Sequence, residues 1–471
     1  MPPRVAVIGA GFGGVAAAVA VRDAVAELVV LERGDDVGGV WRENTYPGAA
    51  CDVPSHLYSY SFAPEHRWSR RFAPQPDILR YLRRVVDEHG LRPHLRLGTE
   101  VTEARWDDDD AVWRLTTADG DDVEVEVLVA ACGQLRRPAR PAVPGLDSFR
   151  GPVLHSARWD HDVDLRGRHV AVVGTGASAV QIVPAIADDV ARLTVFQRSA
   201  DHVVPKPDRR YSAVHRALFR RFPTWARFVR RALMATFERA GAVPVGPAPA
   251  PVQLAFRALR RVLVPDAGLR ARLSPPHPVG VRRALVSSDY YRTLRRPHVG
   301  LVGAPIAEFT PDGIRTADGV EHPVDVVVLA TGFAAGEFLV PMKVFGPDGR
   351  ELSDEWRDGA RAHLGVAVPG FPNLFLVHGP NTALRVGSVI HMIECQAGYV
   401  RQAVERIAAG ARTLVVRPEV ADAYDREMQE RLGAGPGRSV TDWPGTMGEY
   451  ARRTARFDDT EYDSGYTAHR R

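Results

Sequence analysis

The chain has 471 residues, of which 45% are hydrophobic and 25% charged, an ordinary composition for a soluble globular protein of two or three domains. Its 61 basic and 57 acidic side chains leave a net charge of +4, which is too small to argue for a nucleic-acid partner. The three cysteines, Cys51, Cys132 and Cys395, stand far apart. Their spacing predicts no metal site and no disulfide framework, and favours a reducing cytoplasm as the compartment.

The chain begins with the pattern of a strand, a glycine-rich loop, a helix and a second strand. The apolar run 5–8 leads into Gly9-Ala10-Gly11-Phe12-Gly13-Gly14, and the next apolar run, 28–31, ends at Glu32. The first glycine permits a tight turn, the second lets backbone N–H groups approach a pyrophosphate, and a small third residue lets the helix pack on the strand. Because Glu32 can accept hydrogen bonds from free ribose hydroxyls, this unit predicts a site for FAD or NAD.

The segments that follow predict the rest of a first domain. The loop 38–62 is rich in Gly, Pro, Tyr and Ser, whereas 76–90 has the apolar spacing of an amphipathic helix. Alternating runs across 101–129 indicate an antiparallel meander, which ends in the buried-strand pattern 125–131. Four glycines interrupt the apolar stretch 5–21, so we expect a strand and helix there, not a signal peptide or a membrane span.

A second unit of the same kind begins near residue 170. The run 170–173 leads into Gly174-Thr175-Gly176-Ala177-Ser178-Ala179, and the next run, 193–196, ends at Gln197-Arg198-Ser199. Arg198 offers a guanidinium fork to a 2′-phosphate, which Glu32 would repel. One site of each kind predicts a flavoprotein that draws electrons from NADPH. The alternative is a pair of charged strand ends on unrelated units.

The region 201–275 departs from this pattern. Its basic stretches 216–239 and 253–263 are predicted helices on either side of a Pro-, Ala- and Gly-rich segment. Their arginines either dock on an anionic surface or cover the substrate, or they are the solvated faces of an inserted helical subdomain, which is the interpretation we favour. Beyond the insert we expect strands at 326–329 and 374–377 and a helix at 390–408.

These patterns together predict an α/β protein with two Rossmann-like dinucleotide-binding domains and an inserted helical subdomain. The FAD-binding domain is expected at 1–145 and 325–471, the NADP-binding domain at 146–200 and 276–324, and the insert at 201–275. Flavin-dependent disulfide reductases are disfavoured, because Cys51 has no second cysteine near it.

Between the two glycine-rich loops lies Phe149-Arg150-Gly151-Pro152-Val153-Leu154-His155-Ser156-Ala157-Arg158-Trp159-Asp160. It has the form FxGxxxHxxxW(P/D) and resembles the type I Baeyer–Villiger monooxygenases. Gly39-Val40-Trp41 with Tyr46-Pro47-Gly48 and Asp52, the strand-end segments 130–134 and 329–333, and Trp443-Pro444-Gly445 also resemble motifs of that family, in the family's order.

The resemblance implies FAD and NADPH as cofactors, a small-molecule ketone and O2 as substrates, and an ester or lactone formed through a C4a-peroxyflavin. A flavin monooxygenase that oxidises nitrogen or sulfur is the alternative enzyme, and a redox-sensing protein without turnover is the non-enzymatic one. Nucleic-acid binding, a metal site and stable membrane insertion are not expected.

The resemblance also implies roles for particular residues. Pro278-Val279-Gly280-Val281-Arg282-Arg283 resembles the family's Gly-x-Lys-Arg segment, which makes Arg283 the match to the catalytic arginine and Arg282 the match to the lysine that contacts the NADP 2′-phosphate. Asp52 matches the carboxylate that positions that arginine. His155 matches a histidine in a linker between domains, so we expect it to be structural.

The residues expected to bind the cofactors form two groups. On the FAD side they are Gly9, Gly11, Phe12, Gly13, Gly14, Glu32, Val40, Trp41, Asp52, Tyr58, Val101 and Gln134. On the NADP side they are Thr175, Gly176, Ala177, Ser178, Ala179, Gln181, Arg198, Ser199, Arg282 and Arg283. Two segments differ from the family: Ala383-Leu384-Arg385-Val386-Gly387 replaces a Gly- and Asn-containing segment near the flavin, and 432–442 is short and lacks tryptophan.

Overall fold

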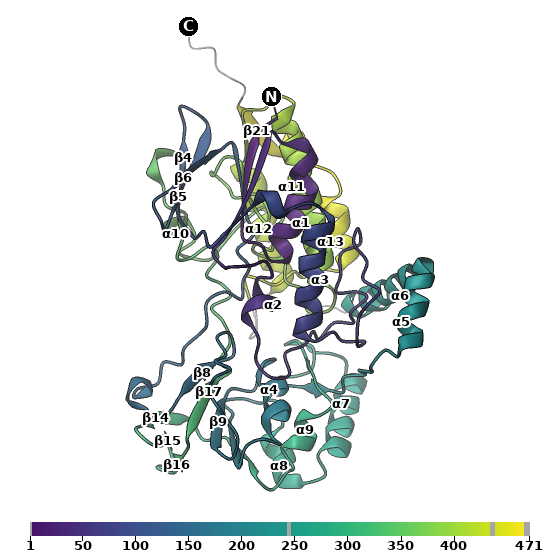
Figure 1. The fold of residues 1–471 in the computed structure, drawn as a ribbon, viewed down its shortest axis with the longest axis vertical. Helices are drawn as coiled ribbons and strands as arrows, with labels where there is room; N and C mark the ends of the chain where they lie inside the picture. Colours follow the sequence, from purple (N-terminus) through teal and green to yellow (C-terminus); the bar gives the residue numbers. More distant parts are fainter. Residues whose placement is uncertain (1, 243–245, 434–438, 466–471) are drawn as a thin grey trace.

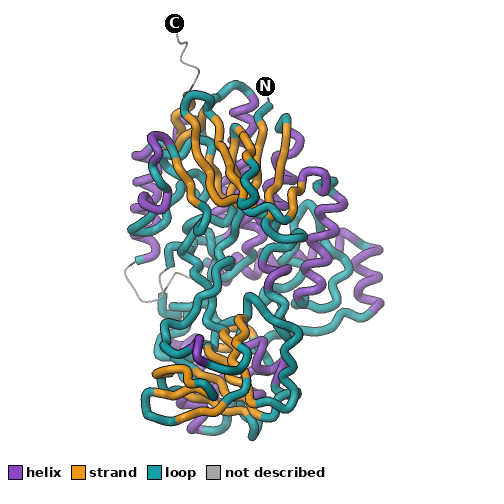
Figure 2. The backbone as a smooth tube through the Cα atoms, turned by 60° about the vertical axis from the view of Figure 1, so that its left-hand side comes forward, coloured by secondary structure: helices purple, strands orange, loops and turns teal. Residues whose placement is uncertain are grey.

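The chain forms two α/β lobes joined by extended segments, in a computed structural model that describes residues 2–242, 246–433 and 439–465 (Figure 1). The strands gather in two separate groups, and loops fill the region between them (Figure 2). Each group contains one five-stranded parallel sheet. The two glycine-rich loops therefore belong to different sheets, as the sequence predicts.

The first sheet has the strand order β19-β7-β1-β2-β3 and is parallel throughout. Its strands are β1 (Arg4–Ile8), β2 (Glu27–Glu32), β3 (Leu95–Leu97), β7 (Val127–Ala130) and β19 (Leu374–Leu376). Helices α1 (Phe12–Val21), α3 (Gln75–Glu88) and α11 (Val389–Ala408) cover one face, where α1 packs against α11. Both faces of β1 and β7 are buried, which explains their uninterrupted apolar runs.

An antiparallel sheet, in the order β18-β4-β5-β6, covers the other face of the first sheet. It consists of β4 (Val101–Asp107), β5 (Val112–Thr117), β6 (Asp122–Val125) and β18 (Lys343–Phe345), and only β18 joins it in parallel. The predicted meander is confirmed. Alternate residues of β5 and β6 face the core, as the period of two requires.

The second sheet has the order β13-β10-β9-β17-β8 and is also parallel. Its strands are β8 (Val153–His155), β9 (His169–Val173), β10 (Arg192–Phe196), β13 (Val299–Val302) and β17 (Val326–Leu329). Helices α4 (Ala179–Ile186) and α9 (Tyr290–Thr293) pack on one face, and the small sheet of β14 (Ile306–Thr310), β15 (Gly313–Thr316) and β16 (Glu321–Pro323) packs on the other.

The expected domain boundary at residue 325 is wrong in one respect. It assigns β17 to the FAD-binding domain, but β17 pairs with β9 along its whole length and with β8 on its other side. A strand belongs to the sheet that satisfies its backbone hydrogen bonds. The first lobe therefore resumes after β17, not before it.

The insert is helical, as expected, but its helices divide between the two lobes. Helices α5 (Ala213–Arg221) and α6 (Pro223–Gly241) contribute Phe219 and Ala226 to the core of the first lobe. Helices α7 (Ala250–Leu263) and α8 (Ala267–Arg272) lie on the second lobe, whose core includes Val264 and Leu269. Figure 1 shows α5 and α6 projecting from the side of the molecule, away from α8.

The remaining elements are short or lie near the C-terminal end. They are α2 (Val40–Glu43), β11 (Val203–Val204), β12 (Leu285–Val286), α10 (Leu352–Glu355), β20 (Thr413–Val416), α12 (Pro418–Leu432), α13 (Met447–Thr454) and β21 (Tyr462–Gly465). Part of the shortened segment 432–442 lies outside the described residues. Among the helices that the structure describes, none is both long and apolar enough to cross a membrane.

Candidate active site

The first glycine-rich loop joins β1 to α1 at the carboxyl edge of the first sheet. Gly9 has φ +100°, and a Cβ there would lie 2.7 Å from the carbonyl oxygen of Ala131. A Cβ on Gly14 would lie 1.7 Å from the oxygen of Gly9, so neither position accepts a side chain. Helix α1 begins without a side-chain cap and without an acidic residue in its first turn. Its unpaired N–H groups are available to a pyrophosphate.

A cleft opens from this loop across the ends of the first sheet. Nine of the residues expected to bind FAD line it: Gly9, Gly11, Phe12, Gly13, Glu32, Val40, Tyr58, Val101 and Gln134. Gly14, Trp41 and Asp52 are not part of its lining. Gly14 instead lets α1 pack on β1, and the indole N–H of Trp41 donates to the Tyr58 hydroxyl at 2.9 Å, which orients Tyr58 in the cleft wall.

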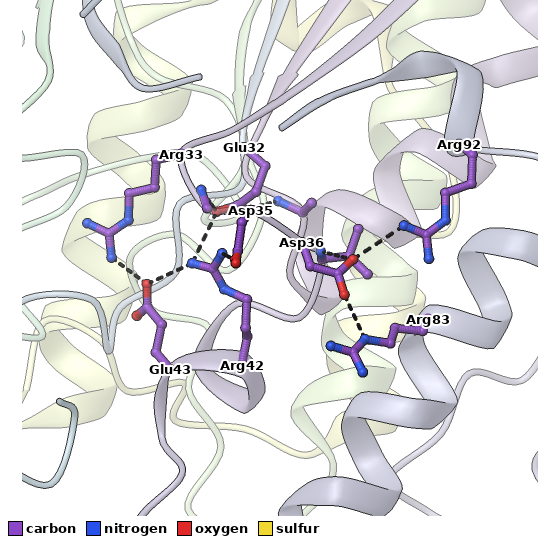
Figure 3. A network of polar contacts seen from close by, with 11 residues as sticks. Glu32, Arg33, Asp35, Asp36, Arg42, Glu43, Arg83 and Arg92 are labelled. Carbon is purple, nitrogen blue, oxygen red and sulfur yellow. Dashed lines mark hydrogen bonds and ion pairs between the residues drawn. The ribbon is translucent and has the colours of Figure 1, made fainter. Parts of the chain in front are cut away.

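Glu32 lies at the end of β2, and its carboxylate is buried. One oxygen accepts from the backbone N–H of Ala10 at 2.7 Å and the other from that of Gly34 at 2.8 Å. Arg42 approaches the same carboxylate at 3.9 Å and contacts Asp35 at 2.8 Å, as Figure 3 shows. This network fixes Glu32 at the cleft wall, where its remaining lone pairs can accept from ribose hydroxyls.

The cleft also has lining residues that the motifs did not indicate. They include Arg33, Thr99, Glu100, Arg136, Met342 and His378. The imidazole Nε2 of His378 is buried without a hydrogen-bond partner among the described residues, and burial lowers the pKa of His378 to about 4. A buried ring nitrogen without a hydrogen-bond partner, in a cleft lined by glycines, is consistent with a site where a bound nucleotide supplies that partner. The signal available in the sequence was position: Arg33 and His378 lie just beyond β2 and β19, at the carboxyl ends of parallel strands.

The second glycine-rich loop is more open than the first. A Cβ at Gly176 would meet nothing within 4 Å, and α4 also begins without a side-chain cap. The hydroxyl of Thr175 donates to the carbonyl oxygen of Ser199 at 2.9 Å, which joins the loop to the end of β10. Arg198 is exposed beside Ser199. Among the described residues no carboxylate forms an ion pair with it, so its guanidinium is available to a phosphate.

Gln181 on α4 connects the two lobes. Its side-chain oxygen accepts from the Tyr46 hydroxyl at 3.0 Å and from the backbone N–H of Ala50 at 3.2 Å, and its amide donates to the oxygen of Ala50 at 3.0 Å. Gly48 packs so closely on α4 that a Cβ there would lie 2.7 Å from the Gln181 carbonyl oxygen. The segment 46–50 is therefore held against the second lobe, two residues before Asp52.

Asp52 and Arg283 meet at this junction. Arg283 Nη2 lies 2.9 Å from Asp52 Oδ2, and the side chains are 45% and 36% exposed. Asp52 lies between Cys51 and Val53, which are buried in the same core against which Tyr58 of the cleft wall packs. Burial raises the pKa of Tyr58 above its ordinary value, and the charge of Asp52 raises it further while that of Arg283 opposes the rise. A partly open, permanently cationic group at the edge of a nucleotide cleft can stabilise an anion formed there.

The turn that carries Arg283 is held from a distant segment. Gly280 has φ +95°, and its carbonyl oxygen accepts from Arg385 Nη1 at 2.9 Å. Arg385 also lies 3.7 Å from Asp442. Arg282 points elsewhere, with Nη1 3.8 Å from Asp201. The segment 383–387, which differs from the family, thus supports the arginine turn directly.

His155 lies at the end of β8, where the chain passes between the lobes. Its Nδ1 accepts from the backbone N–H of Ala157 at 3.0 Å, and its Nε2 lies 3.5 Å from the Thr331 hydroxyl. Thr331 in turn donates to the oxygen of Ala139. These contacts join the two segments that connect the lobes, as expected for a structural histidine.

Comparison with known proteins shows the family to which the chain belongs. The sequence model of the flavin-binding monooxygenase-like family matches residues 3–239. A Baeyer–Villiger monooxygenase of Streptomyces coelicolor is 42% identical, over 98% of this chain and 92% of that protein, and one of Pseudomonas aeruginosa is 37% identical, over 98% and 91%. The chain belongs to this family of Baeyer–Villiger monooxygenases.

Solved structures of the family agree. An oxidised steroid monooxygenase bound to NADP is 32% identical with a TM-score of 0.88, and an open cyclohexanone monooxygenase is 29% identical with a TM-score of 0.87; each alignment covers 98% of this chain and 99% of the other. A third neighbour, OTEMO, binds both FAD and NADP. The expected fold class, the family and the dependence on FAD and NADP are thereby confirmed, and the chain is a flavoprotein monooxygenase.

Proposed function

We propose that this monooxygenase inserts one oxygen atom from O2 beside the carbonyl of a small-molecule ketone, giving an ester or lactone, with Arg283 as the catalytic cation and Asp52 as its positioning residue. The observation that carries the proposal is the 2.9 Å ion pair between these side chains at the edge of the nucleotide cleft. FAD, when bound, accepts a hydride from NADPH and activates O2. The relatives named after cyclohexanone and steroid support a ketone of low polarity as the substrate class.

Each residue at the junction has a definable task. Oxygen insertion beside a carbonyl places negative charge first on the attacking oxygen and then on the former carbonyl oxygen. Arg283 keeps its positive charge throughout, so it can stabilise both anions without exchanging a proton. Asp52 restricts the guanidinium to one side of its turn, and Arg385 fixes the backbone of that turn. Preorganised charge of this kind lowers the barrier without reorganisation during the reaction.

The cofactor-binding assignment follows the same geometry. The residues of the first cleft would hold FAD, with the pyrophosphate at the start of α1 and the ribose at Glu32. The open loop 174–179 would hold the NADP pyrophosphate, and Arg198 with Arg282 the 2′-phosphate. The unpaired cysteines fit a reducing cytoplasm as the location.

The proposal is tested with Arg283→Ala, assayed for NADPH-dependent flavin reduction and, by mass spectrometry, for ester formation from a panel of cyclic and steroidal ketones. Loss of a positioned charge is expected to slow ester formation about a hundredfold or more, equivalent to roughly 3 kcal/mol in the barrier, while flavin reduction continues. Asp52→Ala should show a smaller loss of the same kind.

Arg292→Ala is the matched control, because Arg292 is an exposed arginine of the same lobe that pairs with its neighbour Asp289 at 2.6 Å. It should leave ester formation unchanged. Retained ester formation by folded, FAD-loaded Arg283→Ala protein would contradict the role of Arg283. Formation of an N- or S-oxide as the main product, with no ester from any ketone, would contradict the proposed reaction.

A further inference from the structure

Helices α5 and α6 form a hairpin whose outward surface is apolar. Val214, Leu218, Phe222, Trp225 and Phe228, here called the hairpin face, are between 46% and 67% exposed. Val214 and Leu218 on α5 and Phe222 just after it recur at four-residue spacing, and the rings of Trp225 and Phe228 stack at 5.4 Å. Contiguous exposed aromatic and aliphatic side chains of this kind mark an interaction surface.

The helices that carry the hairpin face are strongly basic. Six exposed arginines belong to them: Arg216, Arg220, Arg221, Arg227, Arg231 and Arg239. The sequence has no Asp or Glu between residues 209 and 237, and among the described residues none of these six arginines forms an ion pair with a carboxylate. Their charges are therefore unbalanced within the molecule.

The hairpin is nevertheless firmly attached, so its exposed side chains are not the result of a loose helix. Phe219 and Ala226 are buried on the inner side. Arg230, the arginine that points inward, donates to the oxygen of Ser59 at 2.6 Å and lies 3.4 Å from Glu394 on α11. The helices thus have one side committed to the first lobe and the opposite side free.

We propose that the α5–α6 hairpin binds the surface of an anionic phospholipid bilayer. Trp, Phe and Leu side chains enter the boundary between headgroups and acyl chains, while flanking arginines neutralise lipid phosphates. A second copy of the chain is disfavoured as the occupant because it would bring two sets of unbalanced arginines together. Val214 and Leu218 also argue against a nucleic acid as the partner, because aliphatic side chains cannot stack on bases as aromatic side chains do or hydrogen-bond to phosphates.

A groove lies between this surface and the loop that follows Asp52. Leu218, Phe222 and Trp225 line it on the hairpin, and Pro54 and His56 line its inner end. Pro54 lies two residues after Asp52, so the groove ends on the loop that carries the positioning carboxylate. The membrane contact is peripheral, through one side of a hairpin, and requires no helix that crosses the bilayer.

The test is flotation of the full-length, FAD-loaded enzyme with vesicles of phosphatidylcholine alone or mixed with phosphatidylglycerol. We expect flotation with the mixed vesicles, weakened by high salt. The double variant Trp225→Ser with Arg221→Ser should lower the bound fraction about tenfold or more. The control Val320→Ser with Arg168→Ser removes an exposed valine and an exposed arginine of the second lobe and should bind as the parent does.

All four substituted positions are exposed, so each variant is expected to fold. Its FAD content and its melting temperature verify this. Failure of the parent to float with phosphatidylglycerol vesicles at low salt overturns the proposal, as does undiminished flotation of the hairpin variant. Concentration-dependent dimerisation, or binding to a short DNA duplex, that the hairpin variant abolishes in the absence of flotation would assign the surface to those partners instead.

Discussion

At the residue scale, the turn 278–283 depends on a contact that lies outside every motif. Arg385 donates to the Gly280 oxygen across 105 positions of sequence, and the charge of Asp442 keeps the guanidinium nearby. We expect Arg385→Met to loosen the turn and slow ester formation about tenfold, because a hydrogen bond from a charged donor contributes roughly 1.5 to 3 kcal/mol.

The measurement is ester formation per bound FAD. The FAD content should be unchanged, since Arg385 does not line the flavin cleft. Arg412→Met is the control, because Arg412 also donates to a backbone oxygen, that of Asp109, but in the turn between β4 and β5 and not at the arginine turn. Equal loss in both variants would show that the effect is one of general stability.

Binding of the 2′-phosphate of NADPH is expected to depend on Arg198. Arg198→Ala should raise the KM for NADPH about tenfold and leave the KM for NADH nearly unchanged, because only the phosphate contact is removed. Steady-state rates with the two nucleotides measure this. If both KM values rise equally, Arg198 has a structural role.

Among the residues of the candidate site, the sequence predicted those whose type and position both follow from a local motif. Glycines at a phosphate loop and acidic or basic residues at a strand end follow from the geometry of the strand–loop–helix unit, so the positions of Glu32 and Arg198 were predictable, while their cofactor contacts stay predictions. The Asp52–Arg283 pair came from family resemblance, since nothing local joins residues so far apart. Arg385 and His378 have no periodic or motif signal that names their partners.

At the element scale, α5 is held on the first lobe by a buried imidazole. The His56 ring lies 4.3 Å from that of Phe219, and burial lowers the pKa of His56 from 6.5 to about 4. Between these values the unfolded chain binds more protons than the folded chain. Folding stability from this group is therefore fully present above pH 6.5 and is lost as the pH falls towards 4.

The variant His56→Phe is expected to remove this loss. Between pH 7 and pH 4 the free energy of unfolding of the variant should fall about 3 kcal/mol less than that of the parent, which corresponds to the lowered pKa. Urea unfolding across this pH range measures the difference. Parallel pH profiles for the two proteins would show that His56 does not stay neutral in the fold.

The helices and strands themselves were predicted more reliably than the elements against which they pack. The apolar spacing that indicates α3 and α11 predicts which face of each helix is buried, but it does not predict which part of the protein packs against that face. For the same reason, the basic helices of the insert were identifiable while their division between two cores was not. A run of buried valines such as β17 suits either parallel sheet equally, which is why the boundary at residue 325 was wrong.

At the scale of the whole molecule, Gln181 forms a contact between the lobes. Gln181→Ala removes three hydrogen bonds to Tyr46 and Ala50. We expect flavin reduction at saturating NADPH to slow about tenfold, because the two nucleotide sites are no longer held in register. FAD content should not change. Stopped-flow absorbance at the flavin band measures the rate.

Two further variants separate this from other effects. Tyr46→Phe removes only the hydroxyl contact and should slow reduction less. Gln429→Ala, whose side chain bonds Asp425 on its own helix, should have no effect. A normal reduction rate in Gln181→Ala would mean that the lobes are positioned by the connecting segments alone.

The first sheet contains strands that precede the second sheet in the sequence and a strand, β19, that follows it, whereas all strands of the second lie between residues 153 and 329. During synthesis on the ribosome, the second lobe has every strand it needs once β17 has emerged. The first must then wait for β19 to cover the edge of β7, and for α11 to cover α1. We therefore expect the order of assembly to reverse the order of the glycine-rich loops: the nucleotide site encoded second is completed first, and the flavin site is among the last parts of the protein to form.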